Sequence, residues 1–328
     1  MNSKKLVLID SYAIIYRSYY AFISRPIFSP KGINTSSIYG YLLAIDEALN
    51  KHKPTHIAAA FDTSAPTFRH IIYPEYKANR EKTPEDIRVA VPIIKDLLRC
   101  LNIQIIEKDG FEADDIIGTI AKKAEDLGYE VIIVTPDKDF AQLVNKNIKL
   151  FRPKKSTSDS EIWGIEEVKK NFEVDYPNQV IDILALWGDT ADNIPGVKGI
   201  GEVTAKKLIA QYKSIENILD HIGELKPSYA KLIEESKNIL NLSKQLVRIE
   251  TNAPIDFNET EFVVKKPNYS ELKQILEELN FKSFINKFIE NNSSINQVAK
   301  QRSLFDNEEN TTVIKDTTSA NIKNTPHE

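Results

Sequence analysis

The chain has 328 residues, enough for two domains or for one large domain with an extension. Apolar residues make up 41% and charged residues 27%, as is typical of a globular chain, and the net charge of −4 does not by itself suggest a polyanionic partner. The single cysteine, Cys100, excludes internal disulfides and thiolate zinc clusters, and the five histidines show no zinc-type spacing, so any bound metal must be held by oxygen, as Mg²⁺ or Mn²⁺ would be.

The N-terminal stretch MNSKKLVLIDSYA runs from a charged start into an acidic residue, unlike a secretory signal. No apolar run approaches the length of a membrane span. We therefore expect a cytoplasmic protein with no membrane partner.

Three apolar runs in the first half of the chain each end at an aspartate. They are LVLID, ending at Asp10, HIAAAFD, ending at Asp62, and EVIIVTPD, ending at Asp137. Continuous apolar runs without alternation predict strands that are buried on both faces, as in a parallel sheet. A further strand is predicted for NIQIIE, residues 102–107.

Helical patterns separate these runs. They cover residues 34–49, residues 83–101, with Thr83 as cap and Pro84 at the first helical position, and residues 112–128, which stop at Gly128. Strands that alternate with helices predict an α/β sheet.

Acidic residues gather where the predicted strands end. Because ligands bind at the carboxyl ends of the strands in such sheets, these side chains belong to one edge. A single aspartate after a strand, or an acidic helix start such as FEADD, is more simply a helix cap. Seven caps on one edge are a poor explanation, so we predict an acidic site formed by Asp10, Asp62, Glu112, Asp114, Asp115, Asp137 and Asp139.

The stretch LWGDTADNIPGVKGIGEVTAKKLIAQY (186–212) holds a concentrated run of glycines. Their order does not fit the dinucleotide-binding pattern, and no strand precedes them. A tight turn from Gly196 through Gly199 to Gly201, leading into a helix near Glu202, could seat a phosphodiester on its backbone N–H groups. The nearby cations Lys198, Lys206 and Lys207 would assist this binding. A plain helix–turn–helix with solvated lysines is an equal alternative.

The chain is thus divided into three parts. Residues 1–175 are predicted to form the α/β domain, residues 176–289 a helical region, and residues 290–328, rich in Asn, Ser, Thr and Lys, a disordered tail or linker.

Several motifs together resemble a known family. FEADD, TPDKD, GDTADNIPGVKGIGEVTA and FRHIIYPEYKANR are similar to the 5′-nuclease domain of bacterial DNA polymerase I and, more broadly, to the flap endonucleases. The similarity runs from about residue 5 to residue 289. It implies a PIN-like, mostly parallel central sheet flanked by helices and followed by a helix–hairpin–helix DNA-binding region.

The resemblance also implies two groups of carboxylates that hold two divalent ions. The first group would be Asp10, Asp62, Glu112 and Asp114, and the second Asp115, Asp137, Asp139, Asp189 and Asp192. All nine positions carry the expected acid, which implies an active nuclease. The implied cofactor is Mg²⁺, with Mn²⁺ as a substitute, and a monovalent cation is a further candidate at the hairpin.

Basic and aromatic residues acquire roles from the same resemblance. The segment around residues 68–82 would form a gateway for the 5′ end of a strand, with Lys77 and Arg80 as catalytic cations and Arg69 and Tyr76 as DNA contacts; a solvated loop is the alternative. Tyr16 and Arg17 match positions near the scissile phosphate. The neighbouring aromatics are assigned instead to the core; they are Tyr12, Tyr19, Tyr20 and Phe22.

We therefore expect a metal-dependent 5′-3′ exonuclease and 5′-flap endonuclease for DNA with flaps, nicks or junctions, acting in replication and repair. It would be a monomer, either standing alone or forming the front part of a DNA polymerase I. A non-catalytic DNA-binding module would require a lost carboxylate, and a small-molecule phosphatase would leave the hairpin and the gateway unused.

The tail contains one short motif. Gln301, Leu304 and Phe305, within QRSLFDNEEN, resemble the peptides by which bacterial repair proteins bind the sliding clamp. A chance match, or docking of the apolar pair on this or a following domain, is the stronger alternative.

Overall fold

The computed structural model describes residues 4–153 and 160–290. Met1–Asn280 form one compact unit, and a second unit begins at Phe281. The described part of the second unit holds α14 (Lys282–Ile285) and a π-helical turn over Asn286–Glu290. Within the described ranges, no helix is both long and apolar enough to cross a bilayer.

A six-stranded sheet forms the centre of the first unit. Its strands are β1 (Lys5–Asp10), β2 (His56–Ala60), β3 (Gln104–Ile106), β4 (Glu130–Val134), β5 (Ile148–Arg152) and β6 (Glu161–Trp163). They lie in the order β3-β2-β1-β4-β5-β6, and every pair is parallel except the antiparallel pair of β5 and β6. The predicted mostly parallel sheet is confirmed. The last two strands were not predicted.

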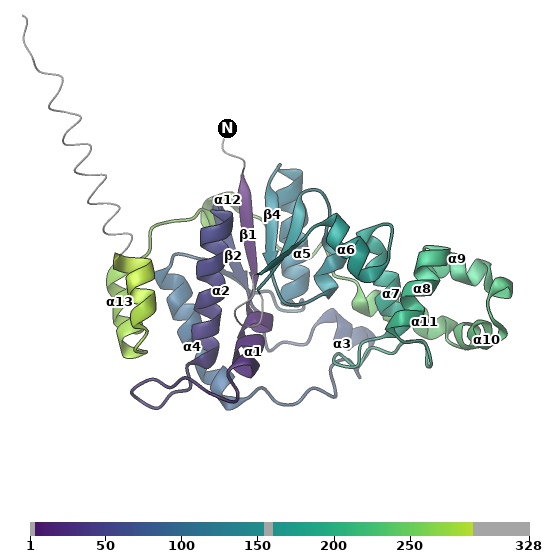
Figure 1. Ribbon diagram of the computed structural model, residues 1–328, viewed down its shortest axis with the longest axis horizontal. Helices are drawn as coiled ribbons and strands as arrows, with labels where there is room; N and C mark the ends of the chain where they lie inside the picture. Colours follow the sequence, from purple (N-terminus) through teal and green to yellow (C-terminus); the bar gives the residue numbers. More distant parts are fainter. Residues whose placement is uncertain (1–3, 154–159, 291–328) are drawn as a thin grey trace, which may run out of the picture. The chain divides into compact units, whose positions relative to one another are not determined.

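Helices cover both faces of this sheet (Figure 1). One layer contains α1 (Ser11–Ala21), α2 (Ser36–His52) and α4 (Glu85–Cys100), which pack on one another and on β1 and β3. The helix α5 (Ala113–Asp126) packs on β1, β2 and β4. Successive β1 residues point to opposite faces, and Leu6 and Val7 are both fully buried, which explains the continuous apolar run.

The helical region follows β6 along the chain. Its elements are α6 (Ile165–Phe172), a 3₁₀ turn over Pro177–Gln179, α7 (Val180–Trp187), α8 (Glu202–Tyr212), α9 (Ile215–Asp220), a 3₁₀ turn over Ile222–Glu224, α10 (Pro227–Glu235) and α11 (Lys237–Val247). The chain then returns to the sheet domain, where α12 (Glu259–Phe262) packs beside β2 and α13 (Tyr269–Glu278) beside α4. The sheet side chains and the α7–α11 helices share one hydrophobic core, which holds the two regions together.

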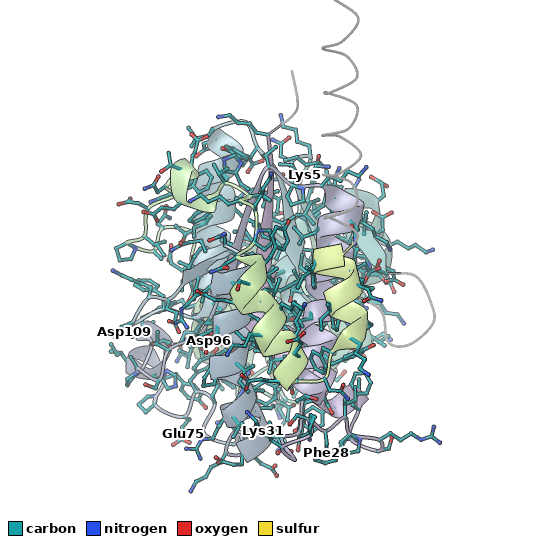
Figure 2. The ribbon with its side chains drawn as sticks, turned by 90° about the vertical axis from the view of Figure 1, so that its left-hand side faces the viewer. Lys5, Phe28, Lys31, Glu75, Asp96 and Asp109 are labelled. Atoms are coloured by element: carbon teal, nitrogen blue, oxygen red, sulfur yellow. The ribbon has the colours of Figure 1, made fainter. Side chains whose placement is uncertain are left out.

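The five parallel strands, β1 to β5, all begin at one end of the sheet domain, and the loops that carry Lys31 and Glu75 lie at the other. Figure 2 shows Lys5, the first residue of β1, at one end, and Lys31 and Glu75 at the opposite end. The carboxyl ends of the parallel strands therefore face these loops. One helix start was misplaced by a residue: α4 begins at Glu85, and Pro84 is its N-cap rather than its first helical residue.

Candidate active site

A cavity of about 910 Å³ opens at the carboxyl edge of the sheet. Its lining brings together six of the nine carboxylates singled out in the sequence, which are Asp10, Asp62, Glu112, Asp114, Asp137 and Asp192. These residues come from β1, the ends of β2 and β4, the start of α5, and the loop after α7. We call this cavity the acidic pocket.

Short hydrogen bonds fix the strand ends that carry these acids. Asp10 ends β1 and accepts a hydrogen bond of 2.6 Å from Thr135 Oγ1, which in turn accepts one of 3.0 Å from the backbone N–H of Asp137. Asp62 accepts a hydrogen bond of 2.8 Å from the N–H of Ala113, the first residue of α5. Thr135 was not singled out in the sequence, although it belongs to the quoted TPDKD motif.

Two further acids lie beside the pocket without appearing in its lining. The N–H of Asp139 donates to Asp137 Oδ1 at 2.9 Å, and Asp139 begins a 3₁₀ turn over Asp139–Leu143. Its own Oδ1 is buried and has no hydrogen-bond partner in the part of the chain that the structure describes. Asp189 accepts a hydrogen bond of 2.8 Å from the N–H of Ala191. A buried carboxylate oxygen without a donor fits a site built for a cation.

Burial and mutual repulsion disfavour charge on this cluster. Burial raises the pKa of Asp10 to about 7, and the charges of Asp137 and Asp62 add to the shift while the Thr135 hydrogen bond opposes it. The pKa of Asp114 is raised well above its ordinary value by burial and then by Asp10 and Asp137. Burial and a neighbouring aspartate likewise raise the pKa of Asp139. A divalent cation would relieve this repulsion.

The carboxylates do not form a ready coordination shell. Among the residues that the structure describes, no three His, Cys, Asp or Glu side chains converge closely enough to hold a metal ion. Basic side chains neutralise part of the cluster instead: Lys77 Nζ lies 2.6 Å from Glu112 Oε1, and Arg80 pairs with Asp192. A metal ion could be held by these acids only if these contacts rearranged.

The predicted metal role of Asp115 stays a prediction, because in this structure the carboxylate is engaged in other contacts. Asp115 is completely buried and forms a bidentate ion pair with Arg69, with N–O distances of 2.7 and 2.8 Å. Its two oxygens also accept hydrogen bonds from the N–H groups of Glu112, at 3.0 Å, and Glu250, at 2.9 Å. The bond from Glu112 belongs to a capping box at the start of α5, so the helix-start interpretation of FEADD holds for Asp115.

Two predicted DNA contacts of the gateway are also buried. Arg69 is 2% exposed, and besides Asp115 it donates to the backbone carbonyls of Leu246 and Arg248, both at 2.8 Å. Tyr76 is 3% exposed, and its hydroxyl donates to Glu112 Oε2 at 2.9 Å. Neither side chain is free to contact a DNA strand. Both hold the gateway segment against the acidic pocket.

The gateway cations themselves lie as predicted, at the pocket. Burial opposes the charge on Lys77, but Glu112 and Asp192 outweigh it and raise the pKa of the ammonium group. Lys77 has φ 58°, and its N–H donates to the carbonyl of Asp192 at 2.9 Å. The left-handed backbone at Lys77 is therefore tied to the loop that carries Asp192, which joins the gateway to the helical region.

The first helix contributes differently from expectation. Tyr16 lines the pocket and its hydroxyl donates to Thr83 Oγ1 at 2.9 Å, whereas Arg17 does not appear in the lining. Tyr12 and Tyr20 were assigned to the core, but both line the acidic pocket and Tyr20 is 55% exposed. An α-helix with strand ends on one side and a cavity on the other exposes part of an apparently apolar face.

The glycine hairpin joins α7 to α8 as predicted. Gly199 has φ 91° and is exposed, Gly201 is the N-cap of α8, and both Lys198 and Lys207 are exposed. Two members of the predicted DNA-contact set also have a role within the protein, and their contact with DNA stays a prediction. A side chain on Gly196 would collide with the backbone carbonyl of Trp187. The Nζ of Lys206 forms an ion pair with Glu202 Oε1 at 2.7 Å and donates a hydrogen bond to the carbonyl of Asn171 at 2.9 Å. The proposed clamp motif, Gln301, Leu304 and Phe305, lies outside the described residues.

Comparison with known proteins places this geometry in context. Residues 5–173 match the family described as "5′-3′ exonuclease, N-terminal resolvase-like domain", and residues 175–270 match "5′-3′ exonuclease, C-terminal SAM fold". The chain is 36% identical to the 5′-3′ exonuclease of Aquifex aeolicus (strain VF5) over 92% of this chain and 100% of that protein. It is 37% identical to the DNA polymerase I of Bacillus caldotenax, covering 87% of this chain and 32% of the polymerase.

Solved structures share the fold at lower identity. The 5′-exonuclease of T5 with bound divalent metal ions (zinc) has a TM-score of 0.65 at 21% identity, covering 84% of this chain and 100% of that one. The catalytic core of Rad2 in complex with a DNA substrate has a TM-score of 0.54 at 19% identity, covering 84% and 88% of the two chains.

Proposed function

Because this chain belongs to the 5′-3′ exonuclease family, we propose that it hydrolyses phosphodiester bonds of DNA at the acidic pocket, as a 5′-3′ exonuclease and a 5′-flap endonuclease. One observation carries the assignment of the site: carboxylates whose pKa values are raised by burial line the same cavity at the sheet edge as Lys77 and Arg80. The phosphates of a DNA substrate would be attracted by Lys77 and Arg80. The carboxylates would in turn be stabilised in their charged form by bound metal ions.

We propose two Mg²⁺ ions as these cations, with Mn²⁺ as a substitute. The unpartnered Oδ1 of Asp139 and the all-oxygen donor set suit such ions. The first would be held by Asp10, Asp62, Glu112 and Asp114, and the second by Asp137, Asp139, Asp189 and Asp192. Two bound ions would lower the pKa of an attacking water and stabilise charge on the attacking and leaving oxygens.

The protein's own groups position the substrate. Lys77 and Arg80 pair with Glu112 and Asp192 before substrate arrives. When cations neutralise these acids, both side chains can turn to the phosphates of the 5′ strand and offset its charge. The side chain of Tyr16, at the pocket wall, is placed to limit where that strand lies. Asp115 and Arg69 keep the start of α5 in place and touch no reacting atom.

The test uses a 5′-flap duplex and a nicked duplex, each labelled at the 5′ end and incubated with Mg²⁺, Mn²⁺ or EDTA. We expect flap-length products and mononucleotides in Mg²⁺ and Mn²⁺ and intact DNA in EDTA. Cleavage that persists in EDTA, or no cleavage of either substrate with divalent ions, would contradict the proposal. The matched control is Asp256→Asn, an exposed acid remote from the pocket in its contacts, which should cut normally.

The biological setting follows from the relatives. The chain spans about a third of the length of the DNA polymerases I that it matches and all of the Aquifex exonuclease. We propose that it removes flaps or primers in replication and repair in the cytoplasm, as a monomer, either alone or ahead of a polymerase domain. The tail peptide is proposed to contact a sliding clamp, which a titration of residues 298–309 against a clamp would test.

A further inference from the structure

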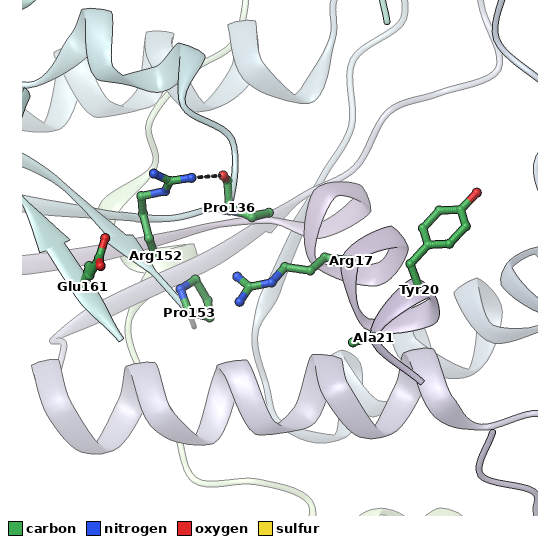
Figure 3. Close-up of a pocket in the computed structure, with 7 residues that line it drawn as sticks. All are labelled: Arg17, Tyr20, Ala21, Pro136, Arg152, Pro153 and Glu161. Atoms are coloured by element: carbon green, nitrogen blue, oxygen red, sulfur yellow. Dashed lines mark hydrogen bonds between the residues drawn. The ribbon is translucent and has the colours of Figure 1, made fainter. Parts of the chain in front are cut away.

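Most walls of the acidic pocket are fixed from within the sheet domain. The hydrogen bonds described above hold the ends of β1 and β2. Figure 3 shows the corresponding contact after β4, where Arg152 of β5 donates to the carbonyl of Pro136 at 2.7 Å. Pro136 immediately precedes Asp137, so this bond holds an acid of the pocket. The gateway segment, residues 68–82, is different because it also contacts the helical region.

The part of the gateway that follows α3 (Phe68–Ile72) has little structure of its own. Residues 73–80, which we call the gateway turns, are closed by backbone hydrogen bonds of 2.9 to 3.0 Å between residues three apart in the sequence. Such turns open locally at little cost. The positions of Lys77 and Arg80 therefore depend on contacts between the gateway turns and the rest of the protein.

Two side-chain amides join the gateway turns to the turn that follows α7. The Nδ2 of Asn79 donates to the carbonyl of Thr190 at 2.6 Å, and the Nδ2 of Asn193 donates to the carbonyl of Glu75 at 2.7 Å. Each segment thus supplies one donor and one acceptor. The backbone hydrogen bond of Lys77 described above lies between them in the sequence. We call these three hydrogen bonds the clasp.

The turn that follows α7 is itself well supported. Asp189 and Ile194 exchange both backbone hydrogen bonds, at 3.0 and 2.7 Å, and so close the turn around Asp192. Ser243 of α11 donates to the carbonyl of Pro195, directly after this turn. Because α11 also packs on α7, the turn is held at both of its ends. The helical region therefore gives the gateway turns a fixed support.

The clasp does not depend on charge, unlike the other contacts between these two segments. Arg80 forms an ion pair with Asp192, and Lys77 Nζ lies 3.7 Å from Asp192 Oδ2. Bound metal ions that neutralise Asp192 would weaken both of these contacts. The clasp joins uncharged N–H groups to backbone carbonyls, so it persists when the side chains of Lys77 and Arg80 turn to a substrate.

We propose that Asn79 and Asn193 are positioning residues, which hold Lys77 and Arg80 at the acidic pocket by joining the gateway to the helical region. Neither asparagine lines the pocket, so neither contacts the reacting atoms. Both act through the backbone on either side of Lys77. A misplacement of about 1 Å in a positioned group can slow a reaction about 100-fold. This inference rests on the proposed nuclease function.

The direct test measures kcat and KM on the 5′-flap duplex in saturating Mg²⁺ for Asn79→Ala and Asn193→Gly. Glycine is chosen because Asn193 has φ 54°, which glycine adopts without strain. We expect each variant to lose about tenfold in kcat and to keep KM within about twofold of the wild type.

The matched control is Asn102→Gly. Asn102 has φ 55°, and its amide donates to the carbonyl of Lys266 at 2.5 Å, so the same kind of contact is removed from the same backbone conformation. Asn102 lies between the end of α4 and the start of β3, at the sheet edge opposite to the acidic pocket. The control should match the wild type in both kcat and KM.

Two further measurements show whether the asparagines act through position. In EDTA, the backbone amides of residues 73–80 should exchange hydrogen faster in both clasp variants than in the wild type or Asn102→Gly. Adding Asn79→Ala to Lys77→Met should reduce kcat by a smaller factor than adding it to the wild type, because one of the groups that Asn79 positions is already absent. Unchanged exchange, or equal factors in the two backgrounds, would overturn the inference.

The kinetic outcomes separate this inference from the nuclease proposal. A raised KM with unchanged kcat would mean that the asparagines bind DNA instead of positioning the gateway, and a wild-type kcat in both variants would also overturn the clasp. In either case the nuclease function stands. If the wild type itself does not cut flap DNA with divalent ions, the nuclease function fails and the positioning role fails with it. Asn79 is exposed, so Asn79→Ala decides the question should Asn193→Gly fail to fold.

Discussion

Replacing Asp115 with asparagine separates a structural carboxylate from a metal ligand. In the wild type its two oxygens accept four hydrogen bonds, two from Arg69 and one each from the N–H groups of Glu112 and Glu250. In Asp115→Asn the side-chain NH₂ would face a hydrogen-bond donor instead of accepting from it. The guanidinium group of Arg69, a residue that is only 2% exposed, would lose its main charged partner. Breaking a buried pair in this way costs about 3–5 kcal/mol.

Glu112 moderates the expected loss. Its Oε2 lies 3.4 Å from Arg69 Nη1, so Glu112 would still neutralise part of the Arg69 charge in the variant. We therefore expect metal-free Asp115→Asn to lose about 3 kcal/mol of unfolding free energy, the lower part of the range. Urea unfolding followed by circular dichroism, in EDTA, measures this quantity. The double variant Asp115→Asn, Arg69→Met should lose less than the sum of the single variants, because it leaves no unpaired charge.

The opposite sign would refute this reasoning. If Asp115 were one of the repelling metal ligands, its neutralisation in metal-free protein would leave stability unchanged or raise it. Asp139→Asn is the matched control for that behaviour, because Asp139 lies beside Asp137, its pKa is raised, and its buried Oδ1 has no hydrogen-bond partner among the described residues. We expect Asp139→Asn to be at least as stable as the wild type in EDTA and to cut flaps poorly in Mg²⁺.

Three further predictions follow from the same contacts. Lys77→Met should cut flaps at least tenfold more slowly than the wild type. It should nevertheless reach half its maximal rate at a lower Mg²⁺ concentration, because the ammonium group that lies 2.6 Å from Glu112 no longer competes with the metal ion. A higher Mg²⁺ requirement would contradict this. Mg²⁺ at about 100 times its Kd should raise the free energy of unfolding by about 2.7 kcal/mol, as measured by thermal melting, and Asp139→Asn should lose most of this gain. Gly199→Val should lower the free energy of unfolding by about 1–3 kcal/mol, because φ is 91° and the added Cβ would lie 3.3 Å from Leu232 Cδ1. The same variant should bind DNA of every sequence more weakly. An unchanged affinity would show that the hairpin does not contact DNA.

The strands β1 to β4, the helices α2, α4 and α5, and the sheet edge that carries the acids could be predicted from the sequence. Asp10, Asp62 and Asp137 each follow an uninterrupted apolar run, and such runs form parallel strands because both of their faces are buried. The carboxyl ends of parallel strands meet at one edge regardless of further detail. The glycine hairpin was also predictable, since its conformation is local: Gly199 adopts a backbone conformation that other residues avoid.

The use of each side chain at that edge was decided only by the tertiary structure. Asp114 and Asp115 are neighbours in the sequence, but adjacent helical residues point about 100° apart, so one faces the pocket and the other the protein interior. Arg69 is held inside the protein in part by its hydrogen bond to the carbonyl of Leu246, which lies 177 residues further along the sequence. Arg17 meets Arg152 only because β5 lies beside β4 in the sheet. Local patterns fix which elements form, whereas long-range packing decides which of their charged groups are neutralised internally and which remain for metal or DNA.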